Sequence, residues 1–218
     1  MKLPDIFTGR GDRQWLQTFS VIRYYPAAPR PEEVRLVDIA HHLSMQCRYT
    51  GACKRFYSVA EHSVLVSEVG PLEYALERLL HDAPEFVLND LNRPTKHTPW
   101  LWGYRHLEAR NWKVIAQKFG LPLKLHPSTK HADDAVLMAE RKVLMLPLPG
   151  KPWLDIAPAD VQIMCLPPAD AEELFLHRFN ELTIRRGYSG EESARTRYRT
   201  AKEWNAMWLE KMEWGMKK

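Results

Sequence analysis

The sequence predicts an all-α fold: a helical bundle with a short extended or hairpin segment near its N-terminal end and a proline-rich loop before its last core helix. Apolar residues recur at helical spacing through most of residues 34–186. Ser58 and Glu61 form the Ser-x-x-Glu capping box that starts such a run. The one β-prone stretch that we find is residues 17–26, QTFSVIRYYP. Helices therefore dominate the predicted fold.

The first predicted elements are a short extended piece and two helices. Loop signals, GRGDR and PAAPRPEE, flank the β-prone stretch within residues 1–35. Val34–Met45 is the first predicted helix, because its apolar residues have helical spacing. The capped helix that follows places His62 on one line with Val59 and Val66. We therefore expect this imidazole to face the core.

A second apolar helix ends in the adjacent pair His81 and Asp82. Pro84 restarts or kinks this helix, because proline lacks a backbone donor. Glu85 follows one turn beyond Asp82, on a similar face. An imidazole and two carboxylates thus gather at the end of one apolar helix.

Three further elements complete the predicted fold. A long amphipathic helix spans Trp100–Gly120 and stops at Gly-Leu-Pro. The next helix is capped by Ser128 or Thr129. Residues 146–170 are dense in proline and long enough to act as a flap, and Ala169–Arg186 returns to helix.

The chain length of 218 residues suits a single domain over residues 1–218, with its core in 34–186 and a C-terminal extension in 187–218. A hydrophobic content of 45% with 27% charged residues is typical of a globular protein. The extension carries an apolar stripe that needs a partner, formed by Trp204, Trp208 and Met212. It docks on its own domain or contacts a second subunit, and together with the tryptophan density it favours a homo-oligomer.

Charge and cysteine content narrow the class of protein. The net charge of +4 is not concentrated in one basic segment, so we expect no polymeric nucleic acid as a partner. The N-terminal residues lack the apolar core of a signal peptide, and no run is long enough to span a membrane. The cysteines, Cys47, Cys53 and Cys165, make no paired framework. We expect a cytoplasmic protein, located in the host cell if the chain is phage-encoded.

Three predicted helices each place a ligand-capable side chain inward. Asp133 lies on one line with apolar residues and with Glu140, and it joins His62, His81 and Asp82 as a mixed nitrogen and oxygen set. A helical bundle can converge such residues on one metal ion and leave positions open for water and substrate. The alternative is a set of hydrogen-bonded core residues. A structural zinc site is disfavoured, because closed zinc sites use mainly cysteine.

The order H…HD…D resembles the HD-domain metal-dependent phosphohydrolases. The surrounding strings resemble the branch of deoxynucleotide 5′-nucleotidases and phage dATP triphosphohydrolases: DIAHHLSMQCRYTG, RFYSVAEHSVLV, LLHDAPEFVLNDLNRPTK and KHADDAVLMAE. The good match spans roughly residues 36–146. The resemblance implies an HD-domain helical bundle that binds a divalent transition metal, Zn, Co or Mn, with Mg as a possible second ion. Imidazole and carboxylate ligands suit these transition metals alike.

Five other residues receive predicted roles. Glu85 can position or deprotonate the attacking water, and Lys96 offers a point charge for phosphate. Arg55 precedes the His62 helix and can grip phosphate through its guanidinium. By resemblance, Asp90 lies near the substrate sugar, a further metal ion or a proton-transfer position, and Ile22 contacts the base. Each of these residues also has a structural or surface role as its alternative.

The resemblance therefore implies an enzyme that acts on free deoxynucleotides. We expect a triphosphohydrolase that prefers dATP and releases deoxynucleoside and triphosphate. A rigid β-branched Ile22 at the purine edge would clash with the 2-amino group of guanine. The first alternative is a 5′-nucleotidase of deoxynucleoside monophosphates. An alternative of another class is a nucleotide-binding protein that keeps the fold without the chemistry.

Overall fold

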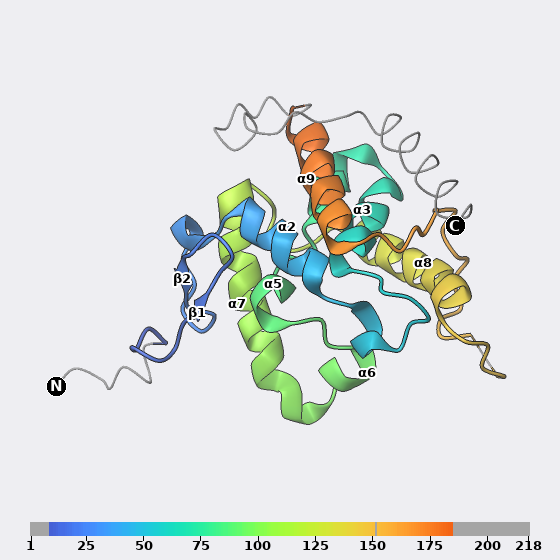
Figure 1. The fold of residues 1–218 in the computed structure, drawn as a ribbon, viewed down its shortest axis with the longest axis horizontal. Coiled ribbons are helices and arrows are strands. Elements are labelled where there is room, and N and C mark those ends of the chain that lie inside the picture. The colour runs from blue at the N-terminus through green and yellow to red at the C-terminus, as the bar shows by residue number, and fades with distance from the viewer. Residues whose placement is uncertain (1–8, 151, 185–218) are drawn as a thin grey trace, which may run out of the picture. The chain divides into compact units, whose positions relative to one another are not determined.

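The computed structural model describes residues 9–150 and 152–184 of the chain, and these residues belong to one compact unit. The predicted C-terminal extension, 187–218, lies outside the described residues. The fold is all-α apart from one pair of very short strands (Figure 1). Its elements are β1 (Leu16–Gln17), β2 (Arg23–Tyr24), η1 (Pro31–Glu33), α2 (Leu36–Met45), η2 (Arg48–Gly51), α3 (Val59–Glu68), η3 (Leu72–Tyr74), α4 (Ala75–Leu79), α5 (Glu85–Leu88), α6 (Arg93–Lys96), η4 (Pro99–Leu101), α7 (Trp102–Phe119), α8 (Pro127–Leu144) and α9 (Pro168–Ile184).

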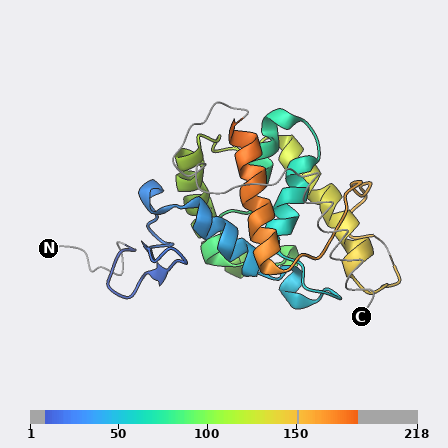
Figure 2. The ribbon, with the colours of Figure 1, turned by 45° about the horizontal axis from the view of Figure 1, so that its top comes forward.

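Helix α3 is the centre of the bundle. It packs against α2, α4, α8 and α9, and Figures 1 and 2 show α2, α9 and α3 side by side. All of its residues except Glu68 are buried. A helix that is enclosed all round must satisfy its polar side chains inside the protein. This requirement applies to Glu61, His62 and Ser63, which are fully buried.

The N-terminal segment forms the predicted hairpin. β1 and β2 pair antiparallel, with Leu16 opposite Tyr24. The connecting turn docks on α2, because Ser20 donates from its backbone N–H and its hydroxyl to the carboxylate of Asp38, at 2.6 and 2.7 Å. The Tyr24 hydroxyl donates to Asn111 Oδ1 of α7 at 2.7 Å. The hairpin is therefore fixed to two helices.

The helix ends differ from the sequence expectation in three places. α4 ends at Leu79, before the predicted end at His81 and Asp82. α2 begins at Leu36, two residues after the predicted start. α8 is capped by His126, whose ring accepts from the Ser128 N–H, so the prediction of Ser128 or Thr129 as cap is wrong. Ser58 does cap α3 by accepting from the Glu61 N–H at 3.1 Å. The Glu61 carboxylate, however, accepts hydrogen bonds from a different segment of the chain.

That segment is the end of the proline-rich loop. The Glu61 carboxylate accepts the backbone N–H groups of Met164, Cys165 and Leu166 at 2.7 to 3.0 Å. The Ala159 N–H also donates to a carbonyl oxygen of α8. Three charge-assisted hydrogen bonds to one buried carboxylate hold a loop firmly. The prediction that residues 146–170 form a flap is therefore wrong for the later part of this segment, because residues 159 and 164–166 are anchored to the helices.

None of the described helices combines the length and the hydropathy that a membrane span needs.

Candidate metal centre

The structure brings the predicted metal ligands together at one end of α3. His62 comes from this helix, His81 and Asp82 follow α4, and Asp133 comes from α8. His62 Nε2 lies 3.5 Å from Asp82 Oδ2 and 3.5 Å from Asp133 Oδ1. His81 Nε2 lies 3.3 Å from Asp82 Oδ2. Segments far apart in the sequence thus place two imidazoles and two carboxylates around one point.

Both imidazoles present a nitrogen without a partner to this point. Five buried side-chain polar atoms have no hydrogen-bond partner in the described parts of the chain, and four of them belong to this region: Arg48 Nε, His62 Nε2, His81 Nε2 and Glu85 Oε2. An unsatisfied buried polar atom costs about 1–3 kcal/mol. Such atoms are expected where a ligand completes the site.

The other nitrogen of each ring is already bound. His81 Nδ1 lies 2.6 Å from the carbonyl oxygen of Arg78, and a carbonyl can only accept. His62 Nδ1 lies 2.6 Å from Glu140 Oε1. Each ring therefore carries hydrogen on Nδ1, and its neutral form has a lone pair on Nε2, directed toward Asp82. Metal-ligating histidines have this arrangement.

The charges in the cluster are strongly coupled. Burial and Arg48 lower the pKa of His62, but Glu140 and Asp133 outweigh them and raise it to about 9. Burial raises the pKa of Asp82, yet His81 and His62 hold it below its usual range. The same two imidazoles hold the pKa of Asp133 well below its usual range, despite burial. The carboxylates thus demand a positive charge between them, which a proton or a cation can supply.

The donor set fits a divalent transition metal. Ligand atoms about 2.0–2.2 Å from a tetrahedral ion stand roughly 3.3–3.6 Å apart, which matches the separations found here. His62, His81 and Asp82 offer ligand atoms within 4.8 Å of one another. Asp133 lies at the edge of this set, since its Oδ2 also accepts from Arg93 and Lys130 at 3.2 and 3.1 Å. Mixed imidazole and carboxylate ligands suit Zn, Co or Mn.

Glu85 lies beside the cluster at the start of α5. Its side chain is buried, and burial, with the carboxylates of Asp82 and Asp90, raises its pKa well above the usual range. Lys96 Nζ is 3.9 Å from Glu85 Oε1 and is also paired with Glu108. The structure therefore brings Glu85 and Lys96 together near the predicted metal ligands. The roles of both residues stay predictions.

Asp90 is held by a residue that the sequence did not single out. Gln46, at the end of α2, accepts the Asp90 N–H at 3.1 Å and donates to the Glu85 carbonyl oxygen at 2.9 Å. Between them Asn89 has φ 68° and ψ 154°, a strained conformation that residues other than glycine rarely adopt. One amide side chain thus clamps both ends of α5. No periodicity or motif in the sequence indicates this role for Gln46.

Arg48, and not the predicted Arg55, contacts the cluster. Arg48 Nη1 is 3.6 Å from Asp82 Oδ2, and its side chain is almost fully buried. Arg55 is exposed, and its guanidinium lies against Cys165. The sequence could not separate the two arginines, because the loop between them has positive φ at Tyr49, Thr50 and Gly51. The phosphate-binding role of Arg55 stays a prediction without a contact to the cluster that the structure shows.

Ile22 lies in the hairpin turn and is partly buried. Its backbone N–H and carbonyl oxygen both bond to Thr18. The turn reaches α5 indirectly, because His42 accepts the Phe19 N–H at 3.0 Å and contacts the carbonyl oxygen of Phe86 at 2.7 Å. The base-contacting role of Ile22 stays a prediction.

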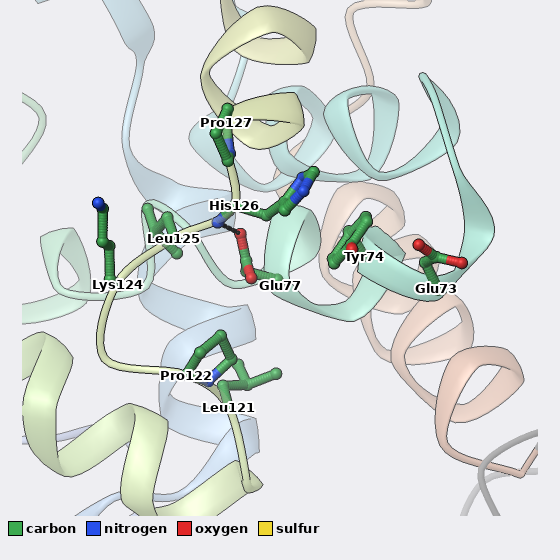
Figure 3. A pocket seen from close by; sticks show the side chains of 9 residues that line it. All are labelled: Glu73, Tyr74, Glu77, Leu121, Pro122, Lys124, Leu125, His126 and Pro127. Carbon is green, nitrogen blue, oxygen red and sulfur yellow. Dashed lines mark hydrogen bonds between the residues drawn. The ribbon is translucent and has the colours of Figure 1, made fainter.

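A hollow of about 500 Å³ lies elsewhere, beside the start of α8 (Figure 3). Its lining contains none of the predicted site residues. Glu77 accepts the His126 N–H there at 2.6 Å, and the rings of Tyr74 and His126 stack at 3.7 Å. These contacts hold the α8 cap in place. Among the described residues, none of the buried side-chain polar atoms without a hydrogen-bond partner lines this hollow, whereas four of them lie at the metal centre, so we place the candidate site there.

Comparison with known proteins gives two relatives. The chain is 36% identical over 173 residues to the uncharacterized protein YfdR of Escherichia coli (strain K12), a match that covers 78% of this chain and 96% of YfdR. It is 37% identical over 133 residues to an uncharacterized protein of Rhodobacter capsulatus, covering 56% of this chain and 67% of that protein. No protein-family model matches the chain.

Proposed function

The chain belongs to the same protein family as YfdR of Escherichia coli, and we propose that it is a metal-dependent phosphohydrolase of free deoxynucleotides. One observation carries the proposal: two buried imidazole nitrogens without a hydrogen-bond partner, His62 Nε2 and His81 Nε2, lie 3.5 and 3.3 Å from Asp82 Oδ2. A purely structural cluster would pair these atoms, because leaving them unpaired costs stability. The resemblance to HD-domain phosphohydrolases supports the same reaction.

In this proposal His62, His81, Asp82 and Asp133 hold the metal ion. A divalent transition metal supplies Lewis-acid chemistry there, activating water and polarising a phosphoryl oxygen. Glu85 accepts a proton from the attacking water, a role for which a buried carboxyl with a raised pKa is suited at neutral pH.

We assign the binding of the phosphate chain to two cations. The guanidinium of Arg48 lies 3.6 Å from Asp82 and can reach an anion at the metal centre. Lys96 adds a second positive charge next to Glu85. In the absence of substrate both cations are paired with carboxylates, so a phosphate would take the place of part of these contacts. Charge stabilisation by these groups is the main catalytic contribution that the chain itself offers.

For the substrate we propose dATP, cleaved to deoxyadenosine and triphosphate, on the strength of the resemblance to phage dATP triphosphohydrolases. The runner-up is a 5′-nucleotidase that hydrolyses deoxynucleoside monophosphates. In the first reading Ile22 presses on the purine edge and rejects guanine. If the chain is a 5′-nucleotidase, the identity of the base has little effect on the rate of hydrolysis.

A nucleotide panel separates these readings from each other and from a non-catalytic binding protein. The purified chain would be incubated with each common dNTP and dNMP in the presence of Mn²⁺, Co²⁺ or Zn²⁺, with and without EDTA. We expect triphosphate from dATP, and its loss in EDTA. Release of inorganic phosphate and deoxynucleoside from every dNMP would select the nucleotidase. Nucleotide binding without hydrolysis under any metal would reject the enzyme.

A further inference from the structure

Glu140 is a buried carboxylate on α8, seven residues after Asp133, with no exposed surface. Its Oε1 lies 2.6 Å from His62 Nδ1 and accepts the Tyr57 hydroxyl at 2.8 Å. Its Oε2 accepts from Arg48 Nη2 at 3.3 Å and from the Tyr49 hydroxyl. All four partners donate toward the carboxylate. Such a set of donors holds it in one orientation.

This arrangement acts directly on the proposed metal ligand His62. Because a carboxylate can only accept, His62 must carry hydrogen on Nδ1. The neutral ring then has its lone pair on Nε2, the atom that lies 3.5 Å from both Asp82 and Asp133. A carboxylate behind an imidazole also makes the imidazole a stronger donor to a metal ion. Without Glu140, the ring could rotate or change tautomer.

The same carboxylate acts on Arg48. Oε2 holds one terminal nitrogen of the guanidinium, while the other, Nη1, reaches to 3.6 Å from Asp82 Oδ2. The Arg48 backbone lies at the start of η2, in a loop with positive φ at Tyr49 and Thr50. Loop arginines are costly to order, because their side chains lose much rotamer freedom. The anchor on α8 fixes this one beside the metal ligands.

We propose that Glu140 is a positioning residue that sets the tautomer and orientation of His62 for metal binding and aims Arg48 at the same site. This inference rests on the proposed metal centre. It adds a residue whose effect is exerted through His62 and Arg48, not through the metal or the substrate.

A purely structural role for Glu140 predicts a different result, and the chain offers a matched control. Glu77 is also a buried carboxylate that anchors α8: it accepts from the His126 N–H at 2.6 Å and from the Thr129 hydroxyl at 2.5 Å. Glu77→Gln should weaken the packing of α8 without reorienting a metal ligand. Glu140→Gln should do both, because its amide group cannot accept from all four donors.

The test is Co²⁺ binding to the full-length protein, measured by competition with a chelator and by the visible absorption spectrum of the bound ion. We expect Glu140→Gln to weaken Co²⁺ binding about 10–100-fold, the usual effect of removing a carboxylate behind a ligating histidine. Its spectrum should shift, since the imidazole is no longer held. Glu77→Gln should bind Co²⁺ within about twofold of wild type, with an unchanged spectrum.

Four outcomes would count against the proposal. Wild-type Co²⁺ affinity and spectrum in a folded Glu140→Gln would overturn the positioning role and leave the metal centre intact. An equal loss in Glu77→Gln would reduce Glu140 to a packing residue. Failure of the wild-type protein to bind Co²⁺ would overturn the metal centre and this inference together.

If Glu140→Gln does not fold, Glu140→Asp replaces it, because a shorter carboxylate cannot reach both His62 and Arg48. Unchanged Co²⁺ affinity of Glu140→Asp would also reject the positioning role.

Discussion

His81 and Asp82 are adjacent in the sequence, and their Nε2 and Oδ2 atoms lie 3.3 Å apart in the structure. The helix ends just before them, at Leu79, and the chain continues in a turn. Side chains of adjacent residues on a continuous helix point about 100° apart, so they do not face each other. Ending α4 here lets both residues turn toward His62. The arrangement of His81 and Asp82 beside His62 therefore depends on the end of α4 as well as on the two side chains.

Loss of either member of this pair should empty the metal centre. We expect His81→Ala and Asp82→Ala to lose bound metal and all hydrolysis but to remain folded, because each is partly exposed and lies outside a helix. Elemental analysis of the purified variants measures this directly. His97→Ala is the control, since His97 is exposed and lies one residue beyond α6. Full metal occupancy in both variants would remove His81 and Asp82 from the site.

Glu85→Gln should separate metal binding from catalysis. The amide keeps the size of the side chain but cannot take a proton, and general-base roles contribute about 10²–10⁴-fold to the rate. We expect metal content at the wild-type level and kcat lower by that factor. Steady-state kinetics on the best nucleotide, alongside elemental analysis, give both quantities. Turnover close to wild type would leave Glu85 as a structural residue.

The pH dependence of the rate should report Glu85. Burial and the charges of Asp82 and Asp90 hold its pKa well above the ordinary value of 4.5. A general base acts in its deprotonated form, so the rate should rise with pH through a point above 4.5 and fall away on the acid side. A kcat/KM profile between pH 4.5 and 9 measures this. An acid limb that persists unchanged in Glu85→Gln would assign it to another group.

The loop before α9 should depend on Glu61. Glu61→Ala leaves the N–H groups of residues 164–166 without an acceptor, and an unpaired buried polar group costs about 1–3 kcal/mol. We expect a loss of stability of at least that size in urea unfolding. The exposed Glu32 provides the comparison, as its change to alanine should stay within about 0.5 kcal/mol. Equal stability of the two variants would show that the loop is held by other contacts.

Ile22→Ala tests the base preference. If this side chain rejects the 2-amino group of guanine, its removal should raise dGTP hydrolysis relative to dATP, because the clash is relieved. Ratios of kcat/KM for the two nucleotides, in wild type and variant, give the answer. A ratio that does not move would mean that Ile22 only packs in the hairpin turn.

Much of the fold could be predicted from local sequence signals. Helical spacing of apolar residues located α2, α7 and α9 to within about three residues, and Gly120 ended α7 as expected, with a left-handed φ of 62°. The N-terminal hairpin followed from β-prone residues between loop signals. The cap of α8 was missed, because a histidine side chain at His126 takes the place that Ser128 or Thr129 was expected to fill.

The site was predictable where it depends on helix faces and was not where it depends on loops. His62 and Asp133 followed from periodicity on α3 and α8. Glu140 lies on the same line as Asp133, but spacing alone does not tell a proposed metal ligand from a residue proposed to position one. Arg48 and Gln46 act from non-helical segments, where side-chain direction follows φ and ψ at individual residues. These backbone angles depend on the tertiary structure, so the directions of the Arg48 and Gln46 side chains could not be predicted from the sequence.

Anomalous diffraction from crystals soaked in Mn²⁺ or Co²⁺ would show whether His62, His81 and Asp82 bind a metal ion. We expect one strong peak about 2.0–2.2 Å from Nε2 of both His62 and His81, with a carboxylate oxygen of Asp82 completing the contact. We also expect the peak to disappear in Asp82→Ala crystals soaked in the same way. An ordered crystal with no peak between the two imidazoles, or with peaks only at surface carboxylates, would contradict the metal centre and the reaction proposed for it.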